Sequence, residues 1–226
     1  MNTREEIKEN IARIKETLGG AKLLAATKTI DAETINFAIE CGVDAVGENK
    51  VQEVLEKYDK LRLGDAEYHF IGRLQTNKVK YIVDKVDMIE SVDREALALE
   101  IEKRCAAIGK IMPVLVEVNV GGEESKGGIK PEELSTFCEF LSALPHIKLR
   151  GLMAIPPKAA EGAKNDEYFS KMSKIFIDIR AKNVDNSNIN ILSMGMSGDY
   201  ADALKNGSTE IRIGSAIFGE RVYKIR

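Results

Sequence analysis

The chain has 226 residues, of which 44% are hydrophobic and 31% are charged, and its formal net charge is −3. This composition is typical of a globular protein, and the length suits one large domain or two small ones. A weak negative charge gives no long-range attraction to nucleic acid or anionic lipid, so neither is expected as a partner, although a local basic patch is compatible with it.

The sequence shows no targeting signal and no membrane span. The stretch 1–15 is charged and amphipathic, with Ile7, Ile11 and Ile14 on one helical face, and it lacks the apolar segment of a signal peptide. No apolar run approaches the roughly 18 residues of a membrane span. The three cysteines are an odd number without a CxxC motif, which indicates reduced thiols and a cytoplasmic protein.

Apolar runs and helical patterns alternate along the chain with little between them. The runs predict strands at 23–28, 44–49, 67–72, 87–91, 112–120, 148–156, 189–196 and 209–219. Helices are predicted at 1–20, 33–42, 50–62, 74–86, 94–109, 130–144, 163–183 and 199–207. In the helix at 130–144, Pro131 stands where the first turn is expected, because a missing N–H costs least there.

Eight successive β-then-α units predict an α/β protein with parallel strands. Eight units in this length fit a closed (β/α)₈ TIM barrel better than an open sheet, and no GxGxxG motif follows the first strand. We expect one domain over 1–226, with a leading helix at 1–20 and the barrel at 21–221. The seven residues 220–226 that follow the last strand are expected to hold no second domain.

Small and polar residues follow the last two strands, where such barrels often hold phosphate. The segment MGMSGD at 194–199 leads into a helix, and IGSA at 213–216 repeats the pattern with Gly214 and Ser215. Backbone N–H groups and hydroxyls at helix starts bind anions, so the two segments predict a phosphate site. The alternative is that Ser197 only caps its own helix and Gly214 only makes a turn.

Two basic residues stand at strand positions that do not require them. Lys28 ends the first strand, where a lysine can act as an amine nucleophile, although a lysine extending to solvent at the rim is the ordinary alternative. Arg212 alternates with Ile211 and Ile213, so it points to the opposite face of the last strand. If it faces the barrel axis, it either pairs with an internal acid such as Glu117 or Glu210, or donates to a ligand's ring nitrogen.

A lysine, a phosphate site and an arginine together suit pyridoxal 5′-phosphate, which has an aldehyde, a phosphate and a ring nitrogen. A cofactor-free sugar-phosphate lyase that forms a Schiff base would also use the lysine and the phosphate site. His69 lies within a strand and is expected to be a hydrogen-bonded core residue. With two histidines in the chain, no histidine-based metal site is expected. Lys126 lies in a glycine-flanked loop and is expected to be solvated.

Several longer motifs carry a family resemblance: TK at 27–28, GENKVQE at 47–53, HFIGRLQTNK at 69–78, the pattern E.N...E..K.G at 117–128, GLMAI at 151–155, and the stretch 194–219. From about residue 20 to 221 the sequence resembles the pyridoxal phosphate homeostasis protein family, formerly labelled proline synthetase co-transcribed protein. This family is a single-domain relative of the N-terminal barrel of alanine racemase. The resemblance therefore implies a barrel like that of fold type III pyridoxal phosphate enzymes.

The resemblance also implies roles for individual residues. Lys28 matches the lysine that holds the cofactor as an internal aldimine, and Arg212 matches the arginine near its ring nitrogen. Ser197, Gly214 and Ser215 match the phosphate contacts, and Asn49 matches the asparagine beside the ring. Met153 and Ser193 match positions around the cofactor less closely. Lys126 matches a loop lysine that influences cofactor exchange. Lys50 and Tyr68 depart from the aromatic residue and the tryptophan that many members carry, which puts local packing alone in doubt.

The implied role is that of a carrier or buffer in intracellular vitamin B6 homeostasis. An arginine at the ring nitrogen leaves that nitrogen unprotonated and weakens the cofactor as an electron sink. Racemases of the related family take a catalytic tyrosine from a second domain of the partner subunit, and Tyr200 is a poor substitute. We therefore expect a monomer without efficient turnover that delivers the cofactor to apoenzymes. The alternative is a slow, racemase-like enzyme acting on amino acids.

Overall fold

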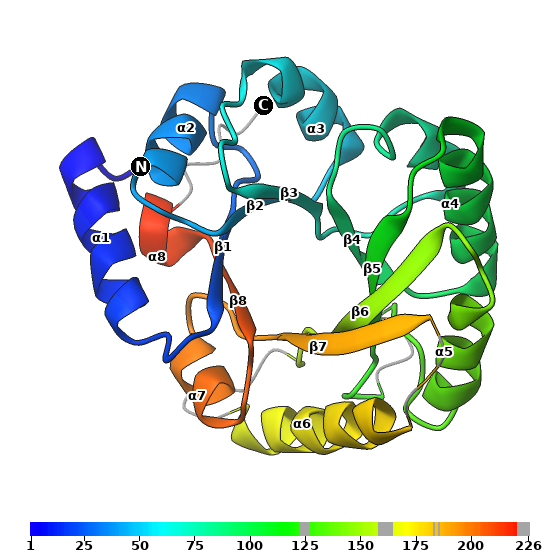
Figure 1. Cartoon of the computed structure of the whole chain (residues 1–226). Coiled ribbons are helices and arrows are strands. Elements are labelled where there is room, and N and C mark those ends of the chain that lie inside the picture. The colour runs from blue at the N-terminus through cyan, green and yellow to red at the C-terminus, as the bar shows by residue number, and fades with distance from the viewer. Residues whose placement is uncertain (123–126, 158–164, 183, 185, 221–226) are drawn as a thin grey trace.

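The computed structural model describes residues 1–122, 127–157, 165–182, 184 and 186–220. Its strands form one closed barrel in the order β1-β2-β3-β4-β5-β6-β7-β8, and every neighbouring pair is parallel. Figure 1 shows the strands as a ring with the helices around its outside. The predicted (β/α)₈ barrel is confirmed.

The strands are β1 (Lys22–Ala26), β2 (Ala45–Glu48), β3 (Glu67–Phe70), β4 (Met88–Val92), β5 (Met112–Glu117), β6 (Ile147–Met153), β7 (Ser187–Ser193) and β8 (Glu210–Ile213). The helices are α1 (Arg4–Glu16), α2 (Ala32–Glu40), α3 (Val51–Lys57), α4 (Glu95–Ile108), α5 (Leu134–Ser142), α6 (Asp166–Ala181), α7 (Tyr200–Lys205) and α8 (Ser215–Phe218). Two short 3₁₀ helices, η1 (Tyr58–Lys60) and η2 (Thr76–Tyr81), complete the regular structure of the described residues.

The leading helix α1 is held at its start by a capping box. The Thr3 side chain accepts from the backbone N–H of Glu6, and the Glu6 carboxylate accepts from the backbone N–H of Thr3. Ile7, Ile11 and Ile14 are buried, as their spacing predicts. The Asn2 side chain donates to Ile217 O at 3.0 Å, which ties the start of α1 to α8 across the barrel's seam.

The strands present two different faces. Residues that point outward, such as Leu23, Val46 and Ile211, join one large apolar core between the sheet and the helices. Residues that point inward form two small apolar clusters, Met88 with Leu115, Met153 and Ile191, and Leu24 with Ala45 and Ile71. Between these clusters the barrel interior is polar, and this polar part contains the charged strand residues discussed below.

Three expected elements differ from the structure. The strand expected at 209–219 is two elements, β8 at Glu210–Ile213 and the short helix α8 at Ser215–Phe218, with Gly214 between them as the N-cap of the helix. The segment 74–86 is not an α-helix: its regular part is η2, and Ile82 N donates to Val79 O three residues back. Val79, Ile82 and Val83 are buried at helical spacing, but β-branched side chains weaken an α-helix. Pro131 lies in a turn ahead of α5, which begins at Leu134, so its expected place in the first turn is wrong.

None of the helices that the structure describes combines the length and apolarity needed to cross a membrane.

Candidate functional site

Lys28 lies just beyond β1, at the carboxyl-end mouth of the barrel. The strand ends at Ala26 rather than at the expected residue 28, so Lys28 belongs to a turn and is half-buried. The following residue, Thr29, has a φ of 68°, a left-handed conformation that is rare for a β-branched residue. A pocket of about 150 Å³ opens here, and its lining includes Lys28, Thr29, Gly214 and Ser215. The structure thus brings the predicted lysine and half of the predicted phosphate site together.

A buried ion cluster stabilises this turn. The Lys57 ammonium on α3 donates to Thr27 O at 3.0 Å, to Glu48 Oε1 at 2.7 Å and to Glu53 Oε2 at 2.8 Å. Glu53 Oε2 also accepts from the backbone N–H of Thr29 at 2.6 Å, which holds the strained residue in place. The cluster therefore fixes the backbone on both sides of Lys28.

The acids of this cluster differ in their titration. Burial raises the pKa of Glu48, and the charge of Lys57 only partly offsets that effect. Burial also acts to raise the pKa of Glu53, but hydrogen bonds from Lys57 and from Thr29 N–H outweigh it and lower the pKa. The sequence reasoning missed this cluster, because Glu53 and Lys57 at i,i+4 look like an exposed helix pair. The signal was Glu48, an acid inside an apolar strand.

The predicted phosphate segments meet at the start of α8. Ser197 Oγ accepts from the backbone N–H groups of Gly214 at 3.2 Å and Ala216 at 3.1 Å. The hydroxyl therefore does not cap its own helix α7, as the simpler alternative held, but reaches the helix that follows β8. Ser215 is exposed beside it. The arrangement brings the three predicted residues together, with Gly214 and Ser215 in the lining of the pocket that contains Lys28 and with Ser197 Oγ bound to the N–H groups of Gly214 and Ala216.

Arg212 points into the barrel interior, below the mouth, and is 4% exposed. Its Nη1 donates to Ser193 Oγ at 2.7 Å and its Nη2 donates to Ala154 O at 3.0 Å. Within the described residues no ion pair joins it to Glu117 or to Glu210, although its charge acts on the titration of both. The guanidinium is therefore held by two neutral acceptors, Ser193 Oγ and Ala154 O, rather than by a direct ion pair with either acid.

Met153 and Ser193 are neighbours on β6 and β7, where the register pairs one with the other. Both are fully buried. Met153 packs in the inward-facing apolar cluster, and the Ser193 hydroxyl lies between Arg212 and Glu90. Both residues thus line the interior next to Arg212 rather than the pocket of Lys28.

Asn49 follows β2 and lies on another side of the mouth. It lines a pocket of about 310 Å³ together with Gly72, Glu117 and Asn119. It also lines a wider groove of about 630 Å³, whose basic side chains are Lys50, Arg73, Lys78 and Arg94. This groove is the local basic patch that the net charge alone could not exclude. Asn49 does not line the pocket of Lys28, although the two residues follow adjacent strands.

The two departures from the family pattern, Lys50 and Tyr68, do not line the pocket that contains Lys28. Lys50 is exposed at the start of α3. Tyr68 is fully buried on the outer face of β3 and stacks on Tyr58 with ring centroids 6.5 Å apart. The packing of Tyr68 against a helix-side residue agrees with an effect confined to local packing. Lys126 lies outside the described residues.

His69 is a fully buried, hydrogen-bonded core residue, as expected. Burial alone would lower its pKa, but the nearby Glu67 carboxylate and the hydrogen bond to Glu90 raise it to about 10. Donor atoms of His69, Glu90 and Glu210 lie within 4.8 Å of one another, a spacing at which a cation could bind. The sequence reasoning missed this group because its members come from three separate strands. With His69 protonated, the imidazolium itself supplies the positive charge between the acids.

A family model described as "Alanine racemase, N-terminal domain" matches residues 3–222. Among curated relatives, the pyridoxal phosphate homeostasis protein of Aquifex aeolicus is 47% identical over 203 residues, covering 90% of this chain and 88% of the relative. The protein of the same name from Escherichia coli K12 is 34% identical, covering 96% of this chain and 98% of the relative. The chain belongs to this family. The curated relatives compared here are named as homeostasis proteins, not as enzymes.

Solved structures agree with the family assignment. PipY of Synechococcus elongatus PCC7942, solved with PLP bound, superposes with a TM-score of 0.86 at 31% identity, covering 94% of this chain and 100% of PipY. Alanine racemase from Corynebacterium glutamicum superposes with a TM-score of 0.78 at 18% identity, covering 98% of this chain and 63% of the racemase. The second match shows the shared barrel fold alone.

Proposed function

We propose that this member of the family binds pyridoxal 5′-phosphate at the carboxyl end of its barrel and acts as a carrier or buffer of that cofactor. The observation that carries the proposal is the shared pocket of Lys28, Gly214 and Ser215, which places an amine beside backbone donors suited to phosphate. The names of the relatives and the cofactor bound to PipY support it.

Each residue of the candidate site has a separate role in this proposal. The cofactor supplies an aldehyde carbon, with which an amine condenses to form a carbon–nitrogen double bond and one water. Lys28 provides that amine, held by the ion cluster around Lys57. The phosphate contacts come from Ser197, Gly214 and Ser215. Arg212 would face the ring nitrogen of a bound cofactor and Asn49 would lie beside its ring, while Met153 and Ser193 would support the surroundings of Arg212.

We further propose that the protein holds the cofactor without efficient turnover. Arg212 carries a positive charge toward the ring nitrogen, and a cation there disfavours protonation of that nitrogen. The electron-withdrawing power on which amino-acid chemistry depends is thereby reduced. Tyr200, the tyrosine considered as a proton donor, begins α7 and packs half-buried against the core. This position of Tyr200 gives no support for a role as an acid or a base.

The first experiment is the visible absorption spectrum of the purified protein after addition of pyridoxal phosphate. We expect a yellow band that borohydride bleaches, and we expect that band to be absent from Lys28→Ala. Lys148→Ala is the matched control: Lys148 lies near the amino end of β6, where its ammonium contacts Asn186 at 3.3 Å. The proposal fails if wild type shows no such band or if Lys28→Ala keeps it.

A second measurement separates the carrier from its alternatives. Amino acids are added to the loaded protein and product formation is compared with that of free pyridoxal phosphate. A carrier gives no more product than the free cofactor, whereas a racemase-like enzyme gives more. Borohydride trapping that requires a sugar phosphate and no cofactor would instead identify a Schiff-base lyase.

The proposed setting of this function is cytoplasmic, with one chain acting as one carrier domain for PLP-requiring apoenzymes. Three cysteines without disulfide bonds, Cys41, Cys105 and Cys138, support a reducing compartment. Light scattering tests the monomer. Transfer of the cofactor to an apo-aminotransferase, followed by recovery of transaminase activity, tests the delivery role.

A further inference from the structure

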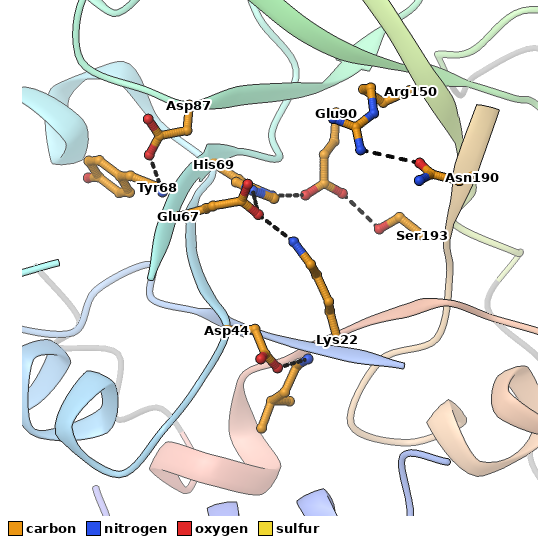
Figure 2. Close-up of polar contacts among 11 residues, drawn as sticks. Lys22, Asp44, Glu67, Tyr68, His69, Asp87, Glu90, Arg150, Asn190 and Ser193 are labelled. Carbon is orange, nitrogen blue, oxygen red and sulfur yellow. Dashed lines mark hydrogen bonds and ion pairs between the residues drawn. The ribbon is translucent and has the colours of Figure 1, made fainter. Parts of the chain in front are cut away.

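A string of charged side chains runs through the barrel interior (Figure 2). Lys22, at the amino end of β1, contacts Glu67 on β3 at 2.7 Å. Glu67 lies 3.5 Å from Nε2 of His69, and Nδ1 of His69 contacts Glu90 Oε1 on β4 at 2.7 Å. The string therefore begins at the amino-terminal end of the barrel, where Lys22 is exposed, and passes into the fully buried interior.

From Glu90 the string continues to the cofactor end. Glu90 Oε2 contacts Ser193 Oγ at 2.7 Å, and Ser193 Oγ contacts Arg212 Nη1 at 2.7 Å. A guanidinium can only donate, so the serine oxygen accepts from Arg212. The single hydroxyl hydrogen of Ser193 is then directed to the Glu90 carboxylate, which can only accept while it is ionised. The guanidinium thus sets the direction of the first bond, and the charge on Glu90 sets the direction of the second.

The charges along the string keep Glu90 ionised. Burial acts to raise its pKa, but the hydrogen bond from His69 and the charges of His69 and Arg212 outweigh burial and lower the pKa. Three acids and three bases lie along or beside the string: Glu67, Glu90 and Glu210, and Lys22, His69 and Arg212. With His69 protonated, the fully ionised set is neutral, which is how a barrel interior can contain this many charges.

We propose that Glu90 is a positioning residue for the cofactor, acting through Ser193 to fix the guanidinium of Arg212 toward the ring nitrogen. This inference rests on the proposed function. Arg212 has five donors, and Ser193 and Ala154 accept from two of its nitrogens. Loss of the carboxylate frees the Ser193 hydroxyl to rotate, and Nη1 then loses its fixed acceptor.

Two substitutions break this link at different points. Glu90→Gln keeps the shape of the side chain but replaces one carboxylate oxygen with an N–H₂ donor. This donor faces either Ser193, whose oxygen already accepts from Arg212, or the N–H of protonated His69, which is itself a donor. Ser193→Ala removes the hydroxyl and leaves Glu90 and His69 in contact. Each substitution therefore weakens a hydrogen bond to a charged group, which is the stronger kind. We therefore expect the dissociation constant for pyridoxal phosphate to rise about tenfold in each variant.

Glu102→Gln is the matched control, because Glu102 forms a similar pair with His146, Oε1 to Nδ1 at 2.7 Å, between α4 and the segment before β6. We expect this variant to bind the cofactor like wild type. The absorption maximum of the bound cofactor is expected to shift in Glu90→Gln and Ser193→Ala but not in Glu102→Gln. In the cofactor-free protein, nitrogen-15 spectra are expected to show faster hydrogen exchange at the Arg212 guanidinium in the first two variants.

A double variant tests whether the two residues act as one unit. If they do, Glu90→Gln combined with Ser193→Ala weakens binding no more than either substitution alone. Additive losses would overturn the proposal, and so would a loss in Glu90→Gln with none in Ser193→Ala. If Glu90→Gln does not fold, Glu90→Asp takes its place: it keeps the charge but withdraws the carboxylate from Ser193, and unchanged cofactor binding in that variant would overturn the proposal. Absence of binding by wild type would instead contradict the proposed function, before any variant is compared.

Discussion

Lys57 is the residue near the candidate site whose replacement should cost most. Its side chain is 10% exposed, and its ammonium contacts Glu48, whose side chain is fully buried. Removing the ammonium leaves the Glu48 carboxylate buried with Thr27 Oγ1 as its remaining donor, at 2.6 Å. A buried ion pair contributes little compared with two apolar residues, but breaking it by removing one partner costs about 3–5 kcal/mol.

We predict that Lys57→Met lowers the free energy of unfolding by about 3 kcal/mol. The same substitution should also weaken cofactor binding, because Lys57 donates to Thr27 O beside Lys28. Urea unfolding and a cofactor titration measure the two effects.

Lys205→Met is the control for this prediction. Lys205 also pairs with an acid, Asp202, but its side chain is 71% exposed, and a pair of that kind contributes about 0–1 kcal/mol. Equal losses of stability in the two variants would show that burial of the Lys57 cluster does not matter.

Lys28 and Lys57 show what could be predicted at this scale. The place of Lys28 at the mouth of the barrel was predictable, because it directly follows the apolar run that forms β1. Lys57 was not, since four residues from Glu53 on a helix it matches the pattern of a solvated pair. Its burial depends on Glu48, which faces the turn after β1 only once β1 and β2 are paired.

At the level of elements, the close approach of β2 and β3 shapes the mouth of the barrel. A Cβ added to Gly72, just after β3, would lie 2.2 Å from Asn49 O. The carbonyl oxygen of Gly72 also accepts from Ser91 Oγ at 2.5 Å. Gly72 therefore fixes the position of Asn49 relative to the ends of β3 and β4.

We predict that Gly72→Ala lowers the free energy of unfolding by about 1–3 kcal/mol, because the added methyl meets backbone that cannot move aside freely. The separation of Asn49 from the β3 end should also weaken cofactor binding. Gly198→Ala is the control for stability, since a Cβ at Gly198 meets no atom within 4 Å. A melting temperature of Gly72→Ala equal to that of Gly198→Ala would contradict the prediction.

The order and type of most elements were predictable, because period-2 and period-3.6 patterns alternate clearly. The prediction of an α-helix at 74–86 was wrong, because buried valines and an isoleucine at helical spacing indicate a packed face but do not distinguish an α-helix from a 3₁₀ helix. Pro131 failed for a related reason: a proline suits a turn as well as a first helical turn. The strands also end earlier than predicted, since the residues at the mouth serve the site rather than the sheet.

For the whole molecule, the least predictable feature is the polar interior of the barrel. Its charges come from β1, β3, β4 and β8, and they meet only when the barrel closes. No local pattern in the sequence pairs Glu90 with Ser193, which is 103 residues away. Each of these residues looked like an isolated polar position in a strand, and the sequence carried no signal for their contact.

This interior predicts how stability depends on pH. His69 has its pKa raised from 6.5 to about 10 by Glu67 and Glu90 against the effect of burial, and burial and then the charge of Glu90 raise the pKa of Glu210 from 4.5 to about 7. The folded protein therefore holds these protons more tightly than the unfolded chain does. Stability is lost as the pH rises from about 4.5 to 7 for Glu210, and from about 6.5 to 10 for His69.

Glu67 acts in the opposite direction. Its contact with His69, and then its contact with Lys22, lower its pKa from 4.5 to about 2, so its contribution is lost as the pH falls through that range. Together, the three groups stabilise the folded state most on the acid side of neutrality. At this pH Glu67 is still ionised, whereas Glu210 and His69 have not yet lost their protons.

Glu210 offers the sharpest test, because among the residues that the structure describes neither of its carboxylate oxygens has a hydrogen-bond partner. Glu210→Gln resembles the protonated acid and does not ionise, so the loss between pH 4.5 and 7 should disappear. At pH 8 the variant should then be more stable than wild type by on the order of 3 kcal/mol, whereas at pH 4.5 the two should be nearly equal. Urea unfolding at both pH values measures the difference. A Glu210→Gln protein whose stability follows the wild-type pH profile would show that Glu210 ionises in the barrel without cost, and that the neighbouring bases already compensate its charge.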